Sequence, residues 1–314
     1  MSKRGNNPNL WKTPGKADRL SEWVVYIFLL LFTLITIITT FGIVAVLSVE
    51  TLHFFRVART TPLEFLTNLK IQPEAEQPVF GILPLVWGTF VVTIGSCLIA
   101  VPIGLTSAIY LSEFARPGVR SFLKPMLELL AGVPTIVYGY LALLLVTPLL
   151  HWVMGLIGVK VEAYNAASAA VVVGIMIIPM VSSLSEDVIR AVPAGLREAG
   201  YSLGATQFEV ITRIVLPAGL SGIMASVILA FSRAIGETMA VVLAAGQLPQ
   251  ISGNIFGSVQ TMTAYIVAVT GGDAPTGSAE HLSLYAVGLV LFLITLALNL
   301  ASGWILSRFR EEYA

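Results

Sequence analysis

Two charged residues, Arg233 and Glu237, lie near the middle of a long apolar stretch and are the first candidates for chemistry. They are four residues apart, so on one helix they would share a face. If that helix begins near Ala218, Arg233 lies about 22 Å along it, well inside the hydrocarbon region of a membrane. A charge at such depth is costly and normally faces a cavity, a partner or a pathway. The pair therefore predicts a path for a charged solute, and a buried ion pair that only neutralises itself is the alternative.

The composition predicts an integral membrane protein. Of the 314 residues, 56% are hydrophobic and 11% are charged, whereas soluble domains carry about a quarter charged residues. The net charge is zero, which gives no reason to expect nucleic acid as a partner. The chain has no GxxxxGKS/T phosphate-binding loop and no HExxH or GxSxG motif, so it is not expected to be an enzyme. If ATP is used, another chain binds it.

Runs of about 20 apolar residues are long enough to cross a bilayer as helices. Six such spans are predicted, at residues 23–49, 84–112, 126–150, 165–183, 218–246 and 282–306. The expected fold class is therefore an all-α membrane protein with six transmembrane helices. Its parts are an amino-terminal tail (1–22), a first span (23–49), a loop (50–83), a core with five spans (84–306) and a tail (307–314). Prolines inside three of the spans predict kinks, at Pro102, Pro134 and Pro179.

The distribution of Lys and Arg predicts that both ends of the chain face the cytoplasm. With that orientation, the cytoplasmic segments hold 13 of the 18 basic residues, the external loops hold 4, and Arg233 is left in the membrane. An even number of spans agrees with this arrangement. The loop at 50–83 is then periplasmic, and the loop at 184–217 is cytoplasmic.

The 184–217 loop carries the signals of two short helices joined by a tight turn. Pro193 suits the first turn of a helix, where its missing N–H costs nothing. Gly204 suits the left-handed position that ends this helix. Thr206 and Glu209 have the spacing of a capping box, which predicts that a second helix starts at Thr206.

The second of these helices is predicted to be amphipathic. Phe208, Ile211 and Val215 follow one another at spacings of three and four, so they should share one apolar face, and Pro217 should end the helix. An apolar face outside the membrane must be buried. Packing against the chain's own spans and docking to a partner are equally good explanations of it.

The same loop resembles the EAA loop of ABC importer permeases. Glu198-Ala199-Gly200, three residues, Gly204, nine residues and Ile214-Val215-Leu216-Pro217 match its spacing at every step, with Gly200 in place of the second alanine. The resemblance implies a type I importer permease (MetI-like) fold, in which this cytoplasmic loop forms coupling helices that dock on an ATPase subunit. It implies ATPase coupling for six residues: Glu198, Ala199, Gly204, Ile214, Leu216 and Pro217.

Four further stretches resemble the PstC branch of this family, which transports phosphate: 80–84 with Gly88-Thr89, 131–139, 231–241 and 260–264. The resemblance implies an inner (plasma) membrane permease with Arg233 and Glu237 in the substrate path. A guanidinium pairs well with phosphate oxygens. The implied partners are a second, PstA-like permease, two PstB-like ATPase subunits that bind ATP and Mg, a PstS-like periplasmic phosphate-binding protein and the lipid bilayer. No cofactor or metal is expected in this chain.

Three alternatives stay open. The chain resembles a PstA-type paralogue less closely, and a permease for another oxyanion would share the same features. A secondary transporter or channel that works without ATP would not need the EAA-like loop.

Overall fold

The computed structural model describes residues 16–73, 75 and 78–309, and these fall into two compact units that divide between Val49 and Glu50, here called the 1–49 and 50–314 units. Over the described residues the regular structure is helical, and its β structure is an isolated bridge between Gln72 and Val79. Of the described helices, five are long and apolar enough to cross a membrane, and a bent helix pair brings the number to six if it forms one span. The all-helical prediction is therefore confirmed.

The first helix, α1 (Lys16–Ala58), contains the first predicted span and continues beyond it. No described side chain between residues 22 and 49 is buried within the chain. The predicted 50–83 loop is wrong at its start, because α1 ends only at Ala58, where Arg59 turns the chain at a φ of 53°. A short helix, α2 (Pro62–Thr67), follows, and a capping box between Thr61 and Glu64 stabilises its amino-terminal end.

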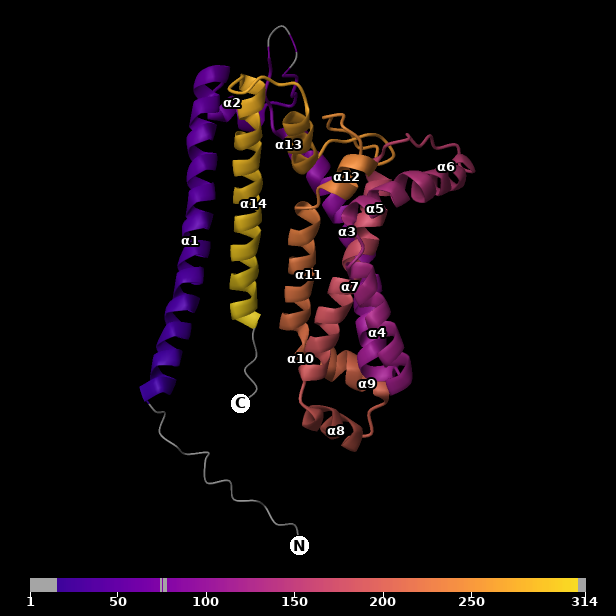
Figure 1. The fold of residues 1–314 in the computed structure, drawn as a ribbon. Helices are drawn as coiled ribbons and strands as arrows, with labels where there is room; N and C mark the ends of the chain where they lie inside the picture. Colours follow the sequence, from indigo (N-terminus) through magenta and orange to yellow (C-terminus); the bar gives the residue numbers. More distant parts are fainter. Residues whose placement is uncertain (1–15, 74, 76–77, 310–314) are drawn as a thin grey trace. The chain divides into compact units, whose positions relative to one another are not determined.

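The second and fourth predicted spans form the pair of helices at the centre of the 50–314 unit, α3 (Leu83–Ile109) and α7 (Ala166–Ala191) (Figure 1). A π-helical turn, η2 (Tyr110–Phe114), extends α3. Pro102 and Pro179 lie inside these helices without ending them. The predicted end of the fourth span at residue 183 is wrong, because α7 continues to Ala191, and Ser185 and Glu186 in this extension contact Ser226 and Arg120 of other helices.

The third predicted span, 126–150, is wrong at both ends. One helix, α4 (Pro117–Ala131), ends before Pro134, and a second begins directly after it. This second run comprises α5 (Thr135–Leu141), η3 (Ala142–Val146) and α6 (Thr147–Gly155). Pro134 therefore starts a helix instead of kinking one, since a residue before proline is disfavoured in the helical conformation.

The fifth predicted span, 218–246, is also interrupted. A run of α9 (Gln207–Val210), η4 (Ile211–Val215) and α10 (Leu216–Ala218) meets α11 (Leu220–Ile235) at a bend of 69°. The chain then breaks at 236–238 before α12 (Met239–Ala244). Gly236 ends α11 as its C-cap, because glycine has low helix propensity and leaves the backbone free to turn. Arg233 and Glu237 therefore do not lie on one continuous helix.

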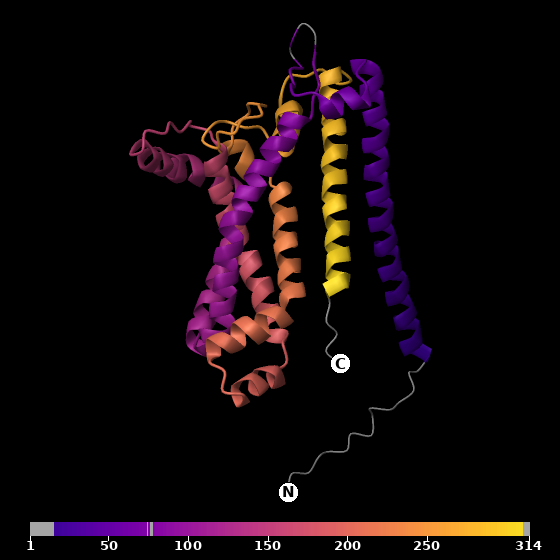
Figure 2. The same ribbon diagram turned by 180° about the vertical axis from the view of Figure 1, so that it is seen from behind.

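Two further helices complete the unit, α13 (Met262–Gly271) within the predicted 247–281 loop and α14 (Ala279–Phe309). The sixth predicted span, 282–306, lies within α14 and is confirmed as a helix. Seen from behind, α11 lies between α3 and α14, and it contacts both (Figure 2). One apolar core joins α3, α7, α11 and α12, and a second joins α2, α3, α13 and α14.

Candidate functional site

Arg233 occupies the last turn of α11 and is exposed, whereas Glu237 lies beyond the end of that helix and is only 7% exposed. Within the described part of the chain, no ion pair shorter than 4.0 Å joins the two side chains. The prediction of a paired Arg and Glu on one helix face is therefore wrong in its geometry. The break after Ile235 separates them.

Glu237 instead holds the broken segment together. Its carboxylate oxygen Oε1 accepts a hydrogen bond of 3.3 Å from the N–H of Ala240, in the first turn of α12. Its backbone carbonyl accepts a hydrogen bond of 2.8 Å from the hydroxyl of Thr263 on α13. Glu237 thus fixes the start of α12 and ties the break to a second helix. Interrupted helices with free backbone groups at membrane depth are typical of transporter binding sites.

A polar cluster surrounds this break at the start of α13. Thr261 caps α13 by accepting from the N–H of Ala264 at 3.2 Å, and its hydroxyl lies 3.0 Å from that of Thr263. The hydroxyl of Thr89 on α3 accepts a 3.0 Å hydrogen bond from the N–H of Met262. These side chains are buried. Sequence reasoning gave the cluster no role, although a run of hydroxyl residues beside an apolar helix was a usable signal.

The close approach of α3 to this cluster depends on Gly88. A Cβ atom there would lie only 2.3 Å from the backbone oxygen of Gln260. Contacts that short do not occur, and a backbone oxygen cannot move aside cheaply. Gly88 therefore lets the backbone of residues 260–263 approach α3 closely, and Thr89 binds this backbone through its hydrogen bond to Met262.

The loop that follows α7 begins at Val192 and has the predicted pair of helices. Pro193 is the N-cap of α8 (Ala194–Ser202), one position before the expected first turn. Gly204 has a φ of +82°, as predicted for a left-handed helix end. Thr206 and Glu209 form the predicted capping box, with 2.9 Å from the Thr206 N–H to the Glu209 carboxylate and 3.3 Å for the return bond. The backbone hydrogen bond from Thr206, followed by that from its side chain, lowers the pKa of Glu209.

The predicted apolar face of the second helix is partly wrong. Ile211 and Val215 are buried, but Phe208 is 70% exposed. Val210 is fully buried instead. Val210 and Val215 belong to one apolar cluster with Ile189 on α7 and Ile223 on α11. The loop therefore packs on its own helices, while Phe208 and Leu203, which is 89% exposed, remain outside this core.

The residues of the EAA-like motif divide into outward and inward groups. Glu198 and Ala199 on α8 are exposed, and so is Pro217. Ile214 and Leu216 are half-buried and border the core of the loop. Gly200 is buried, and a Cβ atom on it would lie 2.6 Å from Cδ1 of Ile214. Gly200 thus permits close packing of α8 on η4.

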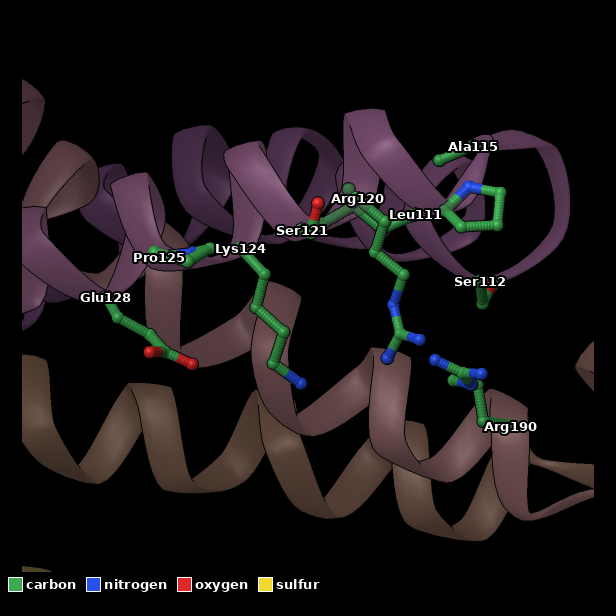
Figure 3. Close-up of a pocket in the computed structure, with 10 residues that line it drawn as sticks. Leu111, Ser112, Ala115, Arg120, Ser121, Lys124, Pro125, Glu128 and Arg190 are labelled. Atoms are coloured by element: carbon green, nitrogen blue, oxygen red, sulfur yellow. The ribbon is translucent and has the colours of Figure 1, made fainter.

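A buried charge cluster joins α4 to α7, and sequence reasoning missed its central residue, Glu186. This carboxylate is fully buried and lies 2.6 Å from Arg120, 3.3 Å from Lys124 and 3.8 Å from Arg190. The three cations line a cavity of about 510 Å³, where the ends of Arg120 and Arg190 point toward one another (Figure 3). The missed signal was helical spacing, since Glu186 and Arg190 are four residues apart in the stretch predicted as a loop.

The cluster favours the charged form of Lys124. Burial lowers the pKa of Lys124, but hydrogen bonds to Asp187 and Glu186 outweigh this effect, so that its pKa is raised overall. The carboxylates of Glu186 and Asp187 offset most of the positive charge. The cluster is therefore best understood as a clamp between α4 and α7.

Comparison with known proteins identifies relatives over nearly the whole chain. Residues 100–311 match the family described as "Binding-protein-dependent transport system inner membrane component". The "Probable ABC transporter permease protein YqgH" of Bacillus subtilis is 34% identical over 88% of this chain and 87% of its own length. The "Phosphate transport system permease protein PstC" of Mesorhizobium japonicum is 35% identical over 79% and 80%. Its namesake in Xylella fastidiosa strain Temecula1 is 30% identical over 97% of both chains.

Solved structures share the fold at low sequence identity. A bacterial ABC transporter involved in the import of the acidic polysaccharide alginate matches with a TM-score of 0.65 at 16% identity, covering 94% of this chain and 99% of that one. An inward-facing structure of the MetNI methionine ABC transporter matches with a TM-score of 0.53, also at 16% identity, covering 74% and 95%. At such identities these matches concern the fold alone.

Proposed function

Because the chain belongs to the family of binding-protein-dependent transport system inner membrane components, we propose that it is a permease subunit of an ATP-driven importer of inorganic phosphate. The observation that carries the proposal is the alignment with relatives named phosphate transport permeases, one of which covers 97% of this chain. The broken helix near Arg233 supports it, because among the described residues Arg233 has no ion-pair partner within 4.0 Å, and a cation of this kind at membrane depth suits passage of an anion.

Arg233 serves in this proposal as the transient counter-ion of the phosphate. Its guanidinium can bind two phosphate oxygens at once. Glu237 acts less directly than the sequence suggested, by fixing the break that leaves Arg233 at the end of α11. The nearby hydroxyls of Thr261 and Thr263 add polar groups that replace part of the hydration of the anion.

The remaining parts of the importer are expected to be separate chains. Two PstB-like ATPase subunits would bind ATP and Mg and receive the exposed face of α8, including Glu198 and Ala199. A PstA-like permease would complete the path, and a PstS-like protein would deliver phosphate from the periplasm. In this arrangement the chain spans the inner membrane with α8 and both termini in the cytoplasm.

Replacement of Arg233 tests the proposed substrate path. Arg233→Ala should lower radiolabelled phosphate uptake by about ten- to hundredfold, since a hydrogen-bonded charge contributes about 1.5–3 kcal/mol. Uptake is measured in cells that lack their own importer, with sulfate as competitor and the amount of assembled complex as reference. The matched control is Arg56→Ala, an exposed arginine at the end of α1. Normal uptake by Arg233→Ala, or phosphate uptake without ATP hydrolysis, contradicts the proposal.

A further inference from the structure

Arg197 stands next to the exposed Glu198 in α8 but points in the opposite direction, into the protein. Its guanidinium donates hydrogen bonds to the carbonyl oxygens of Val192 at 2.5 Å and Ile189 at 2.7 Å. It also donates to the carboxylate of Glu113 at 3.0 Å. The Arg197 side chain is 19% exposed and that of Glu113 is 9% exposed. One side chain thus joins α8 to two other elements.

The first of these elements is the carboxyl end of α7. The last carbonyl groups of a helix have no partners within the helix and carry its partial negative charge. Arg197 binds the carbonyl groups of Ile189, in the last turn, and of Val192, the C-cap. The Ile189 carbonyl also accepts from the N–H of Val192 at 3.4 Å, so Arg197 adds a second hydrogen bond there and supplies one to the Val192 carbonyl. It also adds a favourable charge at the point where the chain leaves α7.

The second element is η2, the π-helical turn that extends α3. Glu113 belongs to η2 and receives two bonds from the loop. Its carboxylate accepts from Arg197 in α8, and its backbone oxygen accepts a 3.0 Å bond from the side-chain amide of Gln207 in α9. Glu113 therefore holds the helices on both sides of the Gly204 turn. π-Helical turns often lie at functional sites in helical proteins.

These contacts resist sliding of α8 over the bundle. A charged hydrogen bond with little exposure to water is strong, and separating its partners leaves a poorly solvated carboxylate and takes one hydrogen bond from each of the Val192 and Ile189 carbonyl groups. Apolar contacts such as those of Ile214 and Val210 can shift by small steps instead. The charged contacts thus make α8 and the ends of α3 and α7 move as one.

We propose that the Arg197–Glu113 ion pair transmits displacement of α8 to α3 and α7, which makes both residues positioning residues for the coupling of ATP hydrolysis to transport. This inference rests on the proposed function. Glu198, on the outer face of the same helix, would meet the ATPase, and Arg197 carries the motion inward.

The test is the number of ATP molecules hydrolysed per phosphate transported by the complete importer in proteoliposomes. Arg197→Lys keeps the charge but loses the planar fork that reaches three acceptors. Glu113→Gln keeps the shape but loses the charge. Each should raise the ratio about fivefold or more, the usual scale of coupling between two sites. The matched control is Arg213→Lys, an exposed arginine of η4, which should leave the ratio unchanged.

A merely structural role predicts a different result. Both variants would then reduce the amount of assembled complex, while the remaining complexes keep the wild-type ratio, and that outcome overturns the inference. If Glu113→Gln does not assemble, Arg197→Lys and Gln207→Ala provide the test. Gln207→Ala removes only the hydrogen bond to the Glu113 backbone, so it should raise the ratio less than Arg197→Lys does. Failure of the wild-type importer to transport phosphate contradicts the proposed function instead, and the ratio is then measured for the solute that it does transport.

Discussion

The arginines of this protein differ in what their charges contact. Arg120 and Arg190 lie beside Glu186, and Arg197 binds Glu113. Arg233 forms no ion pair within 4.0 Å in the described part of the chain. The first three arginines therefore have partners that explain them, and Arg233 does not. An unexplained cation at membrane depth is the better candidate for contact with a solute.

Glu186 is predicted to be a stability residue. Glu186→Gln removes the one fully buried carboxylate of the clamp and leaves Arg120 and Lys124 without their shared counter-charge. Loss of one partner of a buried pair costs about 3–5 kcal/mol. The melting temperature of the purified protein in detergent should therefore fall by several degrees. Asp187→Asn is the control, since that side chain is 62% exposed and an exposed pair contributes about 1 kcal/mol or less. An equal fall in melting temperature for the two variants would show that the burial of Glu186 does not determine its contribution to stability.

At the scale of elements, glycine and proline decide where the apolar runs become separate helices. Pro134 separates α4 from α5, Gly219 lies at the 69° bend, and Gly236 ends α11. These changes of direction bring residues of one segment against another, through a polar contact in one case and apolar contacts in another. The break at 236–238 meets α13, and the bend at Gly219 lets α9 turn beneath the helices it packs against.

Gly204 sets the angle between α8 and α9. A Cβ atom there would meet nothing within 4 Å, so the cost of a larger residue is backbone strain alone. At a φ of +82° that cost is about 1–2 kcal/mol. Gly204→Val should raise the ATP consumed per phosphate transported, and Gly204→Asn should do so less, because asparagine tolerates this region. Gly155→Val serves as control at a glycine with equally open surroundings. If Gly204→Val consumes as much ATP per phosphate transported as the wild type, the angle of this turn does not affect coupling.

The capping box of α9 should respond to pH. The pKa of Glu209 is lower in the folded protein than its ordinary value of 4.5, so its contribution is present above pH 4.5. It is lost as the pH falls through the lowered pKa, because a protonated carboxyl group accepts hydrogen bonds poorly. Hydrogen exchange of the Thr206 amide is measured in the wild-type protein and in Glu209→Gln at each pH. The wild-type amide should be better protected than that of the variant at higher pH, and should lose this extra protection only in the acidic range. The Thr61 amide in the box of α2 is the internal reference. A constant difference between the two proteins at all pH values would contradict the assignment.

At the scale of the 50–314 unit, the candidate sites lie at different levels along the helices. α8 and α9 lie at one end of this unit, and α2 and α13 lie at the other. The break at 236–238 lies between these ends, at the junction of α11 and α12. Such an order suits a permease, in which a moving contact at one end alters a binding site further along the span.

Cysteine labelling tests the orientation of the unit. In a Cys97→Ser background, Leu203→Cys after α8 should react with a membrane-impermeant thiol reagent only in inside-out vesicles. Asp273→Cys, between α13 and α14, should react only from the opposite side. Both positions are exposed, so differences in burial do not decide the result. Labelling of both from the same side would contradict the orientation inferred from the basic residues.

Local signals in the sequence were enough for much of the fold. Helices form wherever about 20 apolar residues follow one another, which is why α3, α7 and α14 were predicted close to their observed positions. The turn at Gly204 and the box at Thr206 were also predicted, because capping involves residues only three or four positions apart. The resemblance to importer permeases rested on the same short-range spacing.

Only the tertiary structure decided how these segments are interrupted and what their charges contact. The break after Ile235 depends on α13 supplying Thr263 to hold it, and the position of Glu186 depends on α4 lying against α7. Burial of Val210 in place of Phe208 depends on which side of α9 packs against Ile189 and Ile223. Thr263 and Arg120 lie far from Glu237 and Glu186 in the sequence, so spacing within one segment does not show which distant residue will stabilise it.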